Sequence, residues 1–201
     1  MTTSQLKTEI AATIRLYNTK GWSPATSTNY SFRDEENTIW VSRSGVDKSQ
    51  FSENDFITVD ENGLSTGHYI TIKPSAETLI HCTIYQLFPE TKVIFHSHGV
   101  YPILLSMETQ NTVNFEGYEV QKGFAGQTTH VAKVDIRVFD NTQDMEAFSA
   151  TLKNNLASIK HHSFIMRKHG TYAWGNNLFD AKRHLETLDY LCECEWRKKS
   201  S

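Results

Sequence analysis

The spacing of apolar residues along the chain predicts a mixture of helices and strands. Residues 6–17 carry apolar side chains at helical spacing behind a capping segment at Thr3 and Ser4, and Gly21 ends this predicted helix. The same reasoning predicts short strands over 26–33, 38–42, 56–59, 93–98, 132–139, 164–166 and 171–174. It predicts further helices from Pro74 and Ser75 to Pro89, over 101–107, from a cap at 140–142 to about 156, and over 177–197.

The connections between these elements indicate the fold class. The first strands are joined by short turns, such as the acidic turn 34–37, and short turns imply antiparallel pairing. Strands and helices then mix without strict alternation, which favours one mixed sheet with helices packed on it, of the α/β or α+β class. A chain of 201 residues with no repeat or linker is expected to form a single domain over 1–201.

Two histidines end the most apolar of the predicted strands. His96 and His98 follow the run 93–95, and alternating side chains on a strand place both imidazoles on the same face. Burying two imidazoles without a partner is costly, so this pair is better explained by a metal ion than by ordinary core packing.

A third histidine repeats the pattern, because His169 closely follows the apolar run 164–166. Three histidine ligands leave a fourth metal position open, which is the arrangement of catalytic rather than structural zinc sites. Three imidazoles also suit iron, cobalt or manganese, so the residues alone leave the metal open. The other histidines, including the solvated pair His161 and His162, are expected not to be ligands.

Composition and charge bear on the class of partner and on the cellular compartment. The net charge is −3, with 38% hydrophobic and 21% charged residues, which does not suggest a nucleic-acid or membrane surface. No stretch approaches the ~18 apolar residues of a membrane span, and the N-terminus shows no secretory signal. Three cysteines without a disulfide framework favour a reducing compartment, so we expect a cytoplasmic protein.

Several segments, in order, resemble the class II aldolase family. They are residues 24–31 (PATSTNYS), 44–45 (SG), 73–78 (KPSAET), 96–98 (HSH) and 169–175 (HGTYAWG), and the likeness runs from about residue 5 to 197. Within the family, residues 117–122, 129–130 and 140–144 are most similar to the dehydratases of methionine salvage.

The resemblance implies a single three-layer domain, with a central mixed, largely antiparallel sheet flanked by helices. It implies a cyclic homotetramer with an active site near a subunit interface, one zinc ion per subunit, and a sugar phosphate as the small-molecule substrate. The implied zinc ligands are His96, His98 and His169, and the implied phosphate-binding residues are Asn29, Ser44, Gly45 and Ser75.

The implied activity is that of a zinc-dependent lyase in methionine salvage. Such an enzyme dehydrates 5-methylthioribulose 1-phosphate to 2,3-diketo-5-methylthiopentyl 1-phosphate. The acid/base of the dehydratases falls on Glu119, and that of the aldolases on Glu77. From the residues alone, Glu119 fits a solvated helix surface better than a catalytic role, and Glu77 fits the favourable first turn of a helix equally well. Ser75 could likewise be a helix cap instead of a phosphate ligand.

One position departs from the family pattern. Thr28 stands where the first phosphate loop usually has glycine, and glycine would allow a positive φ or a close approach of phosphate. We therefore expect the loop around Asn29 to differ in geometry.

Two other functions remain open at this point. An aldolase or epimerase acting on another short sugar phosphate would use the same metal, with Glu77 as its acid/base. A non-catalytic scaffold that keeps the aldolase fold is the third possibility, although it would not need three intact metal ligands.

Overall fold

A computed structural model describes residues 2–199, and the strands within this range form one eight-stranded sheet. The order across the sheet is β3-β2-β1-β4-β8-β7-β6-β5, and neighbouring strands are antiparallel except for the parallel pair β6 and β7. The strands are β1 (Tyr30–Arg33), β2 (Ile39–Ser42), β3 (Phe56–Val59), β4 (Val93–Ser97), β5 (Thr112–Phe115), β6 (Val134–Phe139), β7 (Ser163–Met166) and β8 (Gly170–Gly175).

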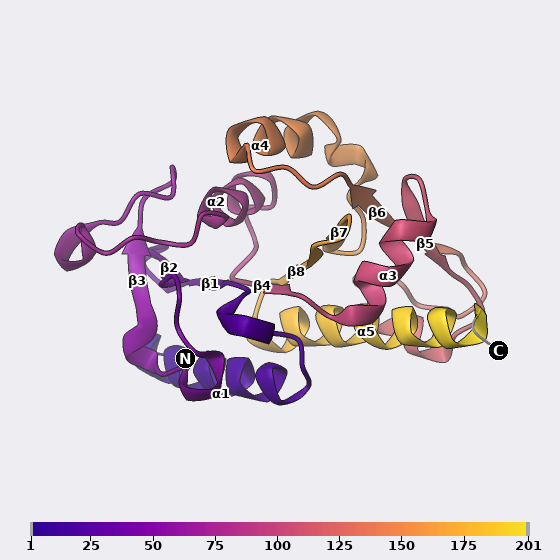
Figure 1. Cartoon of the computed structure of the whole chain (residues 1–201), viewed down its shortest axis with the longest axis horizontal. Helices are drawn as coiled ribbons and strands as arrows, with labels where there is room; N and C mark the ends of the chain where they lie inside the picture. The colour runs from indigo at the N-terminus through magenta and orange to yellow at the C-terminus, as the bar shows by residue number, and fades with distance from the viewer. Residues whose placement is uncertain (1, 200–201) are drawn as a thin grey trace.

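Five α-helices cover the two faces of this sheet: α1 (Thr3–Thr19), α2 (Thr78–Leu87), α3 (Val100–Glu108), α4 (Met145–Asn154) and α5 (Leu178–Lys199). In Figure 1, α2 and α4 lie above the sheet, and α1 and α5 lie below it. Each face has its own apolar core, with Ile80 and Phe148 in one and Ile10 and Leu185 in the other. The predicted three-layer arrangement with a mixed, largely antiparallel sheet is confirmed.

Side chains of β4 alternate between these two cores. Val93 and Phe95 pack in the core below the sheet, and Ile94 packs in the core above it. The pleat therefore turns His96 toward the face that carries α2. Backbone pairing of His96 with Tyr172 on β8 fixes that position in the middle of the sheet.

Several element boundaries differ from the predictions. The expected strand over 26–33 shortens to Tyr30–Arg33, because Ala25, Thr26 and Thr28 have positive φ angles that a strand cannot contain. The helix expected from Ser75 begins at Thr78, so Ser75 does not cap it. The expected cap at 140–142 is wrong as well, since Asp144 accepts the capping hydrogen bond of α4 from the backbone N–H of Ala147.

One strand was not predicted. β5 pairs with β6 at the edge of the sheet, and its alternating burial reflects that half-exposed position. None of the helices described over residues 2–199 is both long and apolar enough to cross a membrane.

Candidate functional site

The three predicted histidines meet where two central strands of the sheet, β4 and β8, end and begin. Each offers a ring nitrogen, and these three atoms lie within 4.8 Å of one another. His96 belongs to β4, His98 follows the same strand, and His169 precedes β8. Antiparallel pairing of β4 with β8 brings the end of the first strand beside the beginning of the second. Residues about 70 positions apart in the chain therefore become neighbours.

Hydrogen bonds outside the cluster orient two of these rings. Nδ1 of His96 lies 2.9 Å from the carbonyl oxygen of Thr171, and Nδ1 of His169 lies 3.1 Å from Oδ1 of Asn141. Both partners are acceptors, so each Nδ1 carries the hydrogen and each Nε2 presents a lone pair. Outer hydrogen bonds of this kind orient metal-ligating histidines.

The carboxylate of Glu77 lies among the same rings. One oxygen, Oε1, is 2.9 Å from Nε2 of His169, and the other, Oε2, is 3.2 Å from Nε2 of His96. Asn29 Nδ2 donates to Oε2 at 2.7 Å, and the Tyr172 hydroxyl donates to it at 2.9 Å. Burial raises the pKa of Glu77, but interactions that favour its ionised form, among them the hydrogen bond from Asn29, outweigh burial and hold the pKa well below its ordinary value.

The donor set fits a divalent cation. Nε2 of His98 lies 2.9 Å from Nε2 of His96, and the ionised Glu77 carboxylate approaches the same atom. The lone pair of His96 Nε2 and the Glu77 carboxylate, which face each other at 3.2 Å, repel unless a positive charge lies between them. Burial also lowers the pKa of His98 to about 4 and that of His96 well below its ordinary value, so both rings are neutral at neutral pH, the form in which imidazole binds a metal.

The residues predicted to bind phosphate lie beside this cluster. Asn29 Nδ2 donates to Oγ of Ser75 at 3.2 Å, so two of the segments predicted to bind phosphate are in direct contact. An isolated β-bridge between Arg43 and Pro74 brings the turn with Ser44 and Gly45 to the same place, and Gly45 has a φ of 74° there.

Thr28 takes the backbone conformation that glycine would have provided. Its φ is 71°, an uncommon value for a β-branched residue and a cost of roughly 1–2 kcal/mol. Its hydroxyl donates to Ser23 and Tyr30 at 3.1 Å each, which helps to hold this conformation. Threonine therefore takes the positive φ that glycine would have allowed more easily, and its side-chain hydrogen bonds offset part of the strain.

The structure places Glu119 apart from the histidine cluster. It begins a short 3₁₀ helix, η5 (Glu119–Gly123), and its side chain is 70% exposed. Its carboxylate pairs with Lys122 and lies 3.7 Å from His130 Nδ1, and among residues 2–199 it has no hydrogen bond or ion pair with the cluster. The hydrogen bond from Lys122 holds the pKa of Glu119 below its ordinary value, so this carboxylate is ionised at neutral pH.

Three residues at the site were not predicted. Tyr172 donates to Glu77, Asn141 orients His169, and His81 contacts Asn29. Tyr172 lies in the motif 169–175, which was a usable signal for it. Asn141 lies in the motif 140–144, which was a signal of the same kind. His81 gave no local signal, because it reaches the site only through the packing of distant segments.

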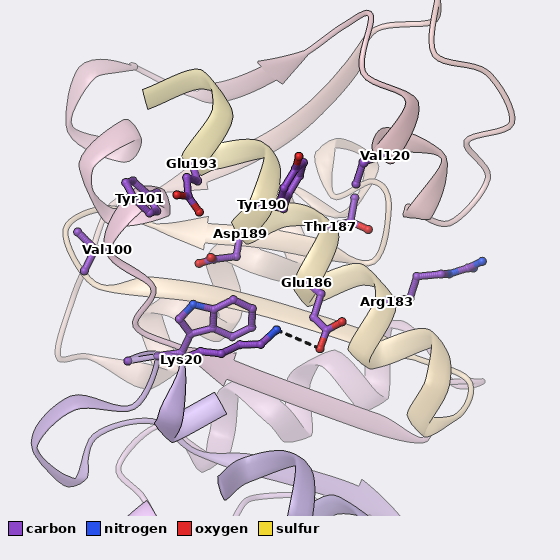
Figure 2. Close-up of a pocket in the computed structure, with 12 residues that line it drawn as sticks. Lys20, Val100, Tyr101, Val120, Arg183, Glu186, Thr187, Asp189, Tyr190 and Glu193 are labelled. Atoms are coloured by element: carbon purple, nitrogen blue, oxygen red, sulfur yellow. Dashed lines mark ion pairs between the residues drawn. The ribbon is translucent and has the colours of Figure 1, made fainter. Parts of the chain in front are cut away.

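A separate cavity of about 760 Å³ lies along α5, and none of the predicted site residues lines it. Figure 2 shows Asp189, Glu186 and Tyr190 of α5 on its wall, together with the ion pair between Lys20 and Glu186. The histidine cluster therefore lies outside this cavity.

The model of the Class II Aldolase and Adducin N-terminal domain family matches residues 8–196 of the chain. The chain belongs to the class II aldolase family. A methylthioribulose-1-phosphate dehydratase from Picosynechococcus is 51% identical over 191 residues, covering 94% of this chain and 90% of the relative. A methylthioribulose-1-phosphate dehydratase from Cronobacter sakazakii is 39% identical over 200 residues, covering 98% and 96%.

Solved structures of class II aldolases share the fold. An L-fuculose 1-phosphate aldolase superposes with a TM-score of 0.79 at 22% identity, covering 100% of this chain and 89% of the other. The L-fuculose-1-phosphate aldolase from Thermus thermophilus gives a TM-score of 0.73 at 18% identity, covering 94% and 92%. At these identities the likeness establishes the architecture alone.

Proposed function

We propose that this chain is a zinc-dependent lyase of methionine salvage. It dehydrates 5-methylthioribulose 1-phosphate to 2,3-diketo-5-methylthiopentyl 1-phosphate, as a cytoplasmic homotetramer with one zinc ion per subunit. The observation that carries this proposal is the 51% identity, over 94% of the chain, with a methylthioribulose-1-phosphate dehydratase. The cluster of His96, His98 and His169 supplies the metal ligands that such chemistry needs.

The proposed reaction removes a proton from the hydroxyl-bearing carbon next to a ketone and a hydroxyl from the following carbon, with a net loss of one water. The enol that remains tautomerises to the second ketone of the product. A bound divalent cation stabilises negative charge on the substrate oxygens. Glu77 is ionised and is held by Asn29 and Tyr172, so its carboxylate is positioned to accept a proton. Asn29 and Ser75, with the turn at Ser44 and Gly45, bind the phosphate and fix the substrate against this carboxylate.

Glu119 is the proposed acid/base for the leaving hydroxyl. A carboxyl group can serve this role when it lies within hydrogen-bond reach of the proton it transfers, and its contribution to rate is typically ~10²–10⁴. Because Glu119 makes no contact with the cluster, the role requires the substrate or η5 to bring the two together.

A second candidate function rests on the position of Glu77. This carboxylate, and not Glu119, lies among the metal ligands, and it is the residue that the resemblance assigns to aldolases. Carbon–carbon cleavage by an aldolase or epimerization would use this same carboxylate. The three histidines argue against a non-catalytic scaffold.

Incubation of the purified protein with methylthioribulose 1-phosphate tests the proposal. We expect the diketone product without carbon–carbon cleavage, and about one zinc ion per chain by elemental analysis. His169→Ala should lose the metal and the activity together. Cleavage products in place of the diketone, or full activity in metal-free protein, would overturn the assignment.

Two matched variants then separate the carboxylates. Glu119→Gln should lower kcat by about 10²–10⁴ and leave the metal content unchanged. Glu77→Gln keeps the size of the side chain and removes its charge, so it should disturb the metal surroundings as well as the rate. Near-normal turnover by Glu119→Gln beside an inactive Glu77→Gln would transfer the acid/base role to Glu77 and favour the aldolase or epimerase.

A further inference from the structure

A chain of hydrogen bonds runs from the core of the protein to Glu77 through a buried histidine. His81 of α2 is 1% exposed, and its Nε2 contacts Oδ1 of Asn29. On the other side of the ring, Nδ1 lies 2.7 Å from Oγ of Ser31, and that hydroxyl lies 2.9 Å from the hydroxyl of Tyr85. The chain therefore links α2 and β1 to the loop that holds Asn29.

The direction of each hydrogen bond follows from Asn29. Its Nδ2 donates to Oε2 of Glu77 at 2.7 Å and to Oγ of Ser75 at 3.2 Å, so its Oδ1 faces His81. A carbonyl oxygen can only accept, so Nε2 of His81 carries the hydrogen and Nδ1 accepts from the hydroxyl of Ser31. Burial lowers the pKa of His81 to about 3, so the ring stays neutral with this single tautomer at physiological pH.

This tautomer matches the direction in which the Asn29 amide points toward Glu77. If the amide turned over, its oxygen would face the Glu77 carboxylate and its NH₂ group would face the N–H of His81. Two acceptors would then face each other at Glu77 and two donors at His81, and leaving such buried groups without a hydrogen bond is costly. With its hydrogen on Nε2, His81 therefore disfavours the turned amide without touching the carboxylate.

We propose that His81 is a positioning residue, which holds Asn29 in the one orientation that directs its NH₂ group to Glu77 and Ser75. Its kinetic consequences rest on the proposed dehydratase function, since they concern the carboxylate and the phosphate-binding hydroxyl of that site. The structural part of the proposal concerns the tautomer of His81 and the direction of the Asn29 amide. This part does not depend on which substrate the protein binds.

Replacement of His81 tests the kinetic part. His81→Leu removes the N–H and leaves a buried acceptor unpaired, so kcat/KM should fall by about 10- to 100-fold. His81→Gln can again donate to Asn29 and should recover to within a few-fold of the unmodified protein. Both variants should keep the metal content, because His81 is not one of the three clustered ligands.

Thr83→Val is the matched control. Thr83 is a buried polar residue of the same helix, and its hydroxyl bonds to Leu79 and Ser149 instead of Asn29. This variant should lower the melting temperature while leaving kcat/KM within about twofold. If His81→Leu behaves in the same way, His81 has only a structural role and the proposal is wrong.

A double-mutant cycle asks whether His81 acts through Asn29. In an Asn29→Ala background the amide no longer exists, so His81→Leu should cost less than about twofold in kcat/KM. An undiminished loss in that background would show that His81 acts by another route and would overturn the proposal.

Nitrogen NMR of the imidazole rings gives a readout that needs no substrate. In folded protein, His81 should appear as a neutral ring with its hydrogen on Nε2 from about pH 5 to 8. A ring protonated on Nδ1 would refute the proposal even if the enzyme is a dehydratase. Conversely, the expected tautomer in a protein that does not dehydrate the substrate would support the positioning role and reject the proposed function.

Discussion

Asp189 of α5 provides a test of the electrostatics outside the active site. Its side chain is buried at the wall of the cavity in Figure 2, and its Oδ1 has no hydrogen-bond partner among residues 2–199. A methyl group added at Gly99 would lie 2.0 Å from this oxygen, so the carboxyl group is packed against the backbone that follows His98. Such a position disfavours a negative charge.

The groups around Asp189 determine its titration. Burial raises the pKa of this carboxyl from the ordinary 3.8 to about 7, and the nearby Glu193 adds to the increase. Lys20 and a hydrogen bond from Trp22 act in the opposite direction but are weaker. In the folded protein Asp189 is therefore neutral below about pH 7, whereas in the unfolded chain it ionises near pH 4.

The sign of the effect follows from linkage. A carboxyl group with a raised pKa in the folded state contributes its full stability below the unfolded pKa, and this contribution is lost as pH rises from about 4 to about 7. The whole loss is at most about 4 kcal/mol, since each pKa unit corresponds to about 1.4 kcal/mol. Asn cannot ionise, so Asp189→Asn should escape this loss.

Urea unfolding of the two proteins at fixed concentration measures the difference. The free energy of unfolding of Asp189→Asn, relative to the unmodified protein, should increase by about 2–3 kcal/mol between pH 5 and pH 8. In thermal unfolding this corresponds to roughly 5–10 °C for a chain of this size. Glu186→Gln, an exposed α5 neighbour paired with Lys20, should show no such change. Parallel pH profiles for Asp189→Asn and the unmodified protein would refute the reasoning.

Two further predictions concern the histidine cluster and the oligomeric state. In Gly170→Ala the new methyl group would lie 2.2 Å from the Ser97 carbonyl oxygen and 2.8 Å from His98, so metal content and activity should both fall at least tenfold. Gly21→Ala is the control, because nothing lies within 4 Å of its new methyl group. It should keep its metal and lose only roughly 1 kcal/mol of stability. Light scattering should give the mass of four 23.0 kDa chains, and a fully active monomer would contradict the proposed homotetramer.

The sequence alone predicted the elements whose signals are local. The strand expected over 56–59 matches β3, and the helix expected over 6–17 lies within α1. The pair His96 and His98 was predicted as one face of a strand, and the structure brings their Nε2 atoms to 2.9 Å. These predictions hold because hydrophobic periodicity reports which face of an element is buried, and burial decides the element.

Loops and edges were predicted less well. β5 alternates polar and apolar side chains, as a half-exposed strand does, but over only four residues, which is a short signal. The segment before β1 looks like a strand in sequence, but Thr28 leaves the extended region because hydrogen bonds to Ser23 and Tyr30 hold it elsewhere. Such bonds join side chains whose positions depend on the fold, and no local pattern records them.

Only the tertiary structure decided how the site is assembled. The sequence determined that three histidines end or follow buried segments, but it is the pairing of β4 with β8 that makes His169 a neighbour of His98. In the same way, Glu77 looked like a helix-terminal residue and Glu119 like the stronger catalytic candidate, yet packing placed Glu77 among the three histidines and Glu119 at the surface. Local sequence fixes which face of an element is buried, whereas contacts between distant segments depend on how all the elements pack together. That is why the sequence could single out the three histidines, and only the folded sheet could show which carboxylate stands beside them.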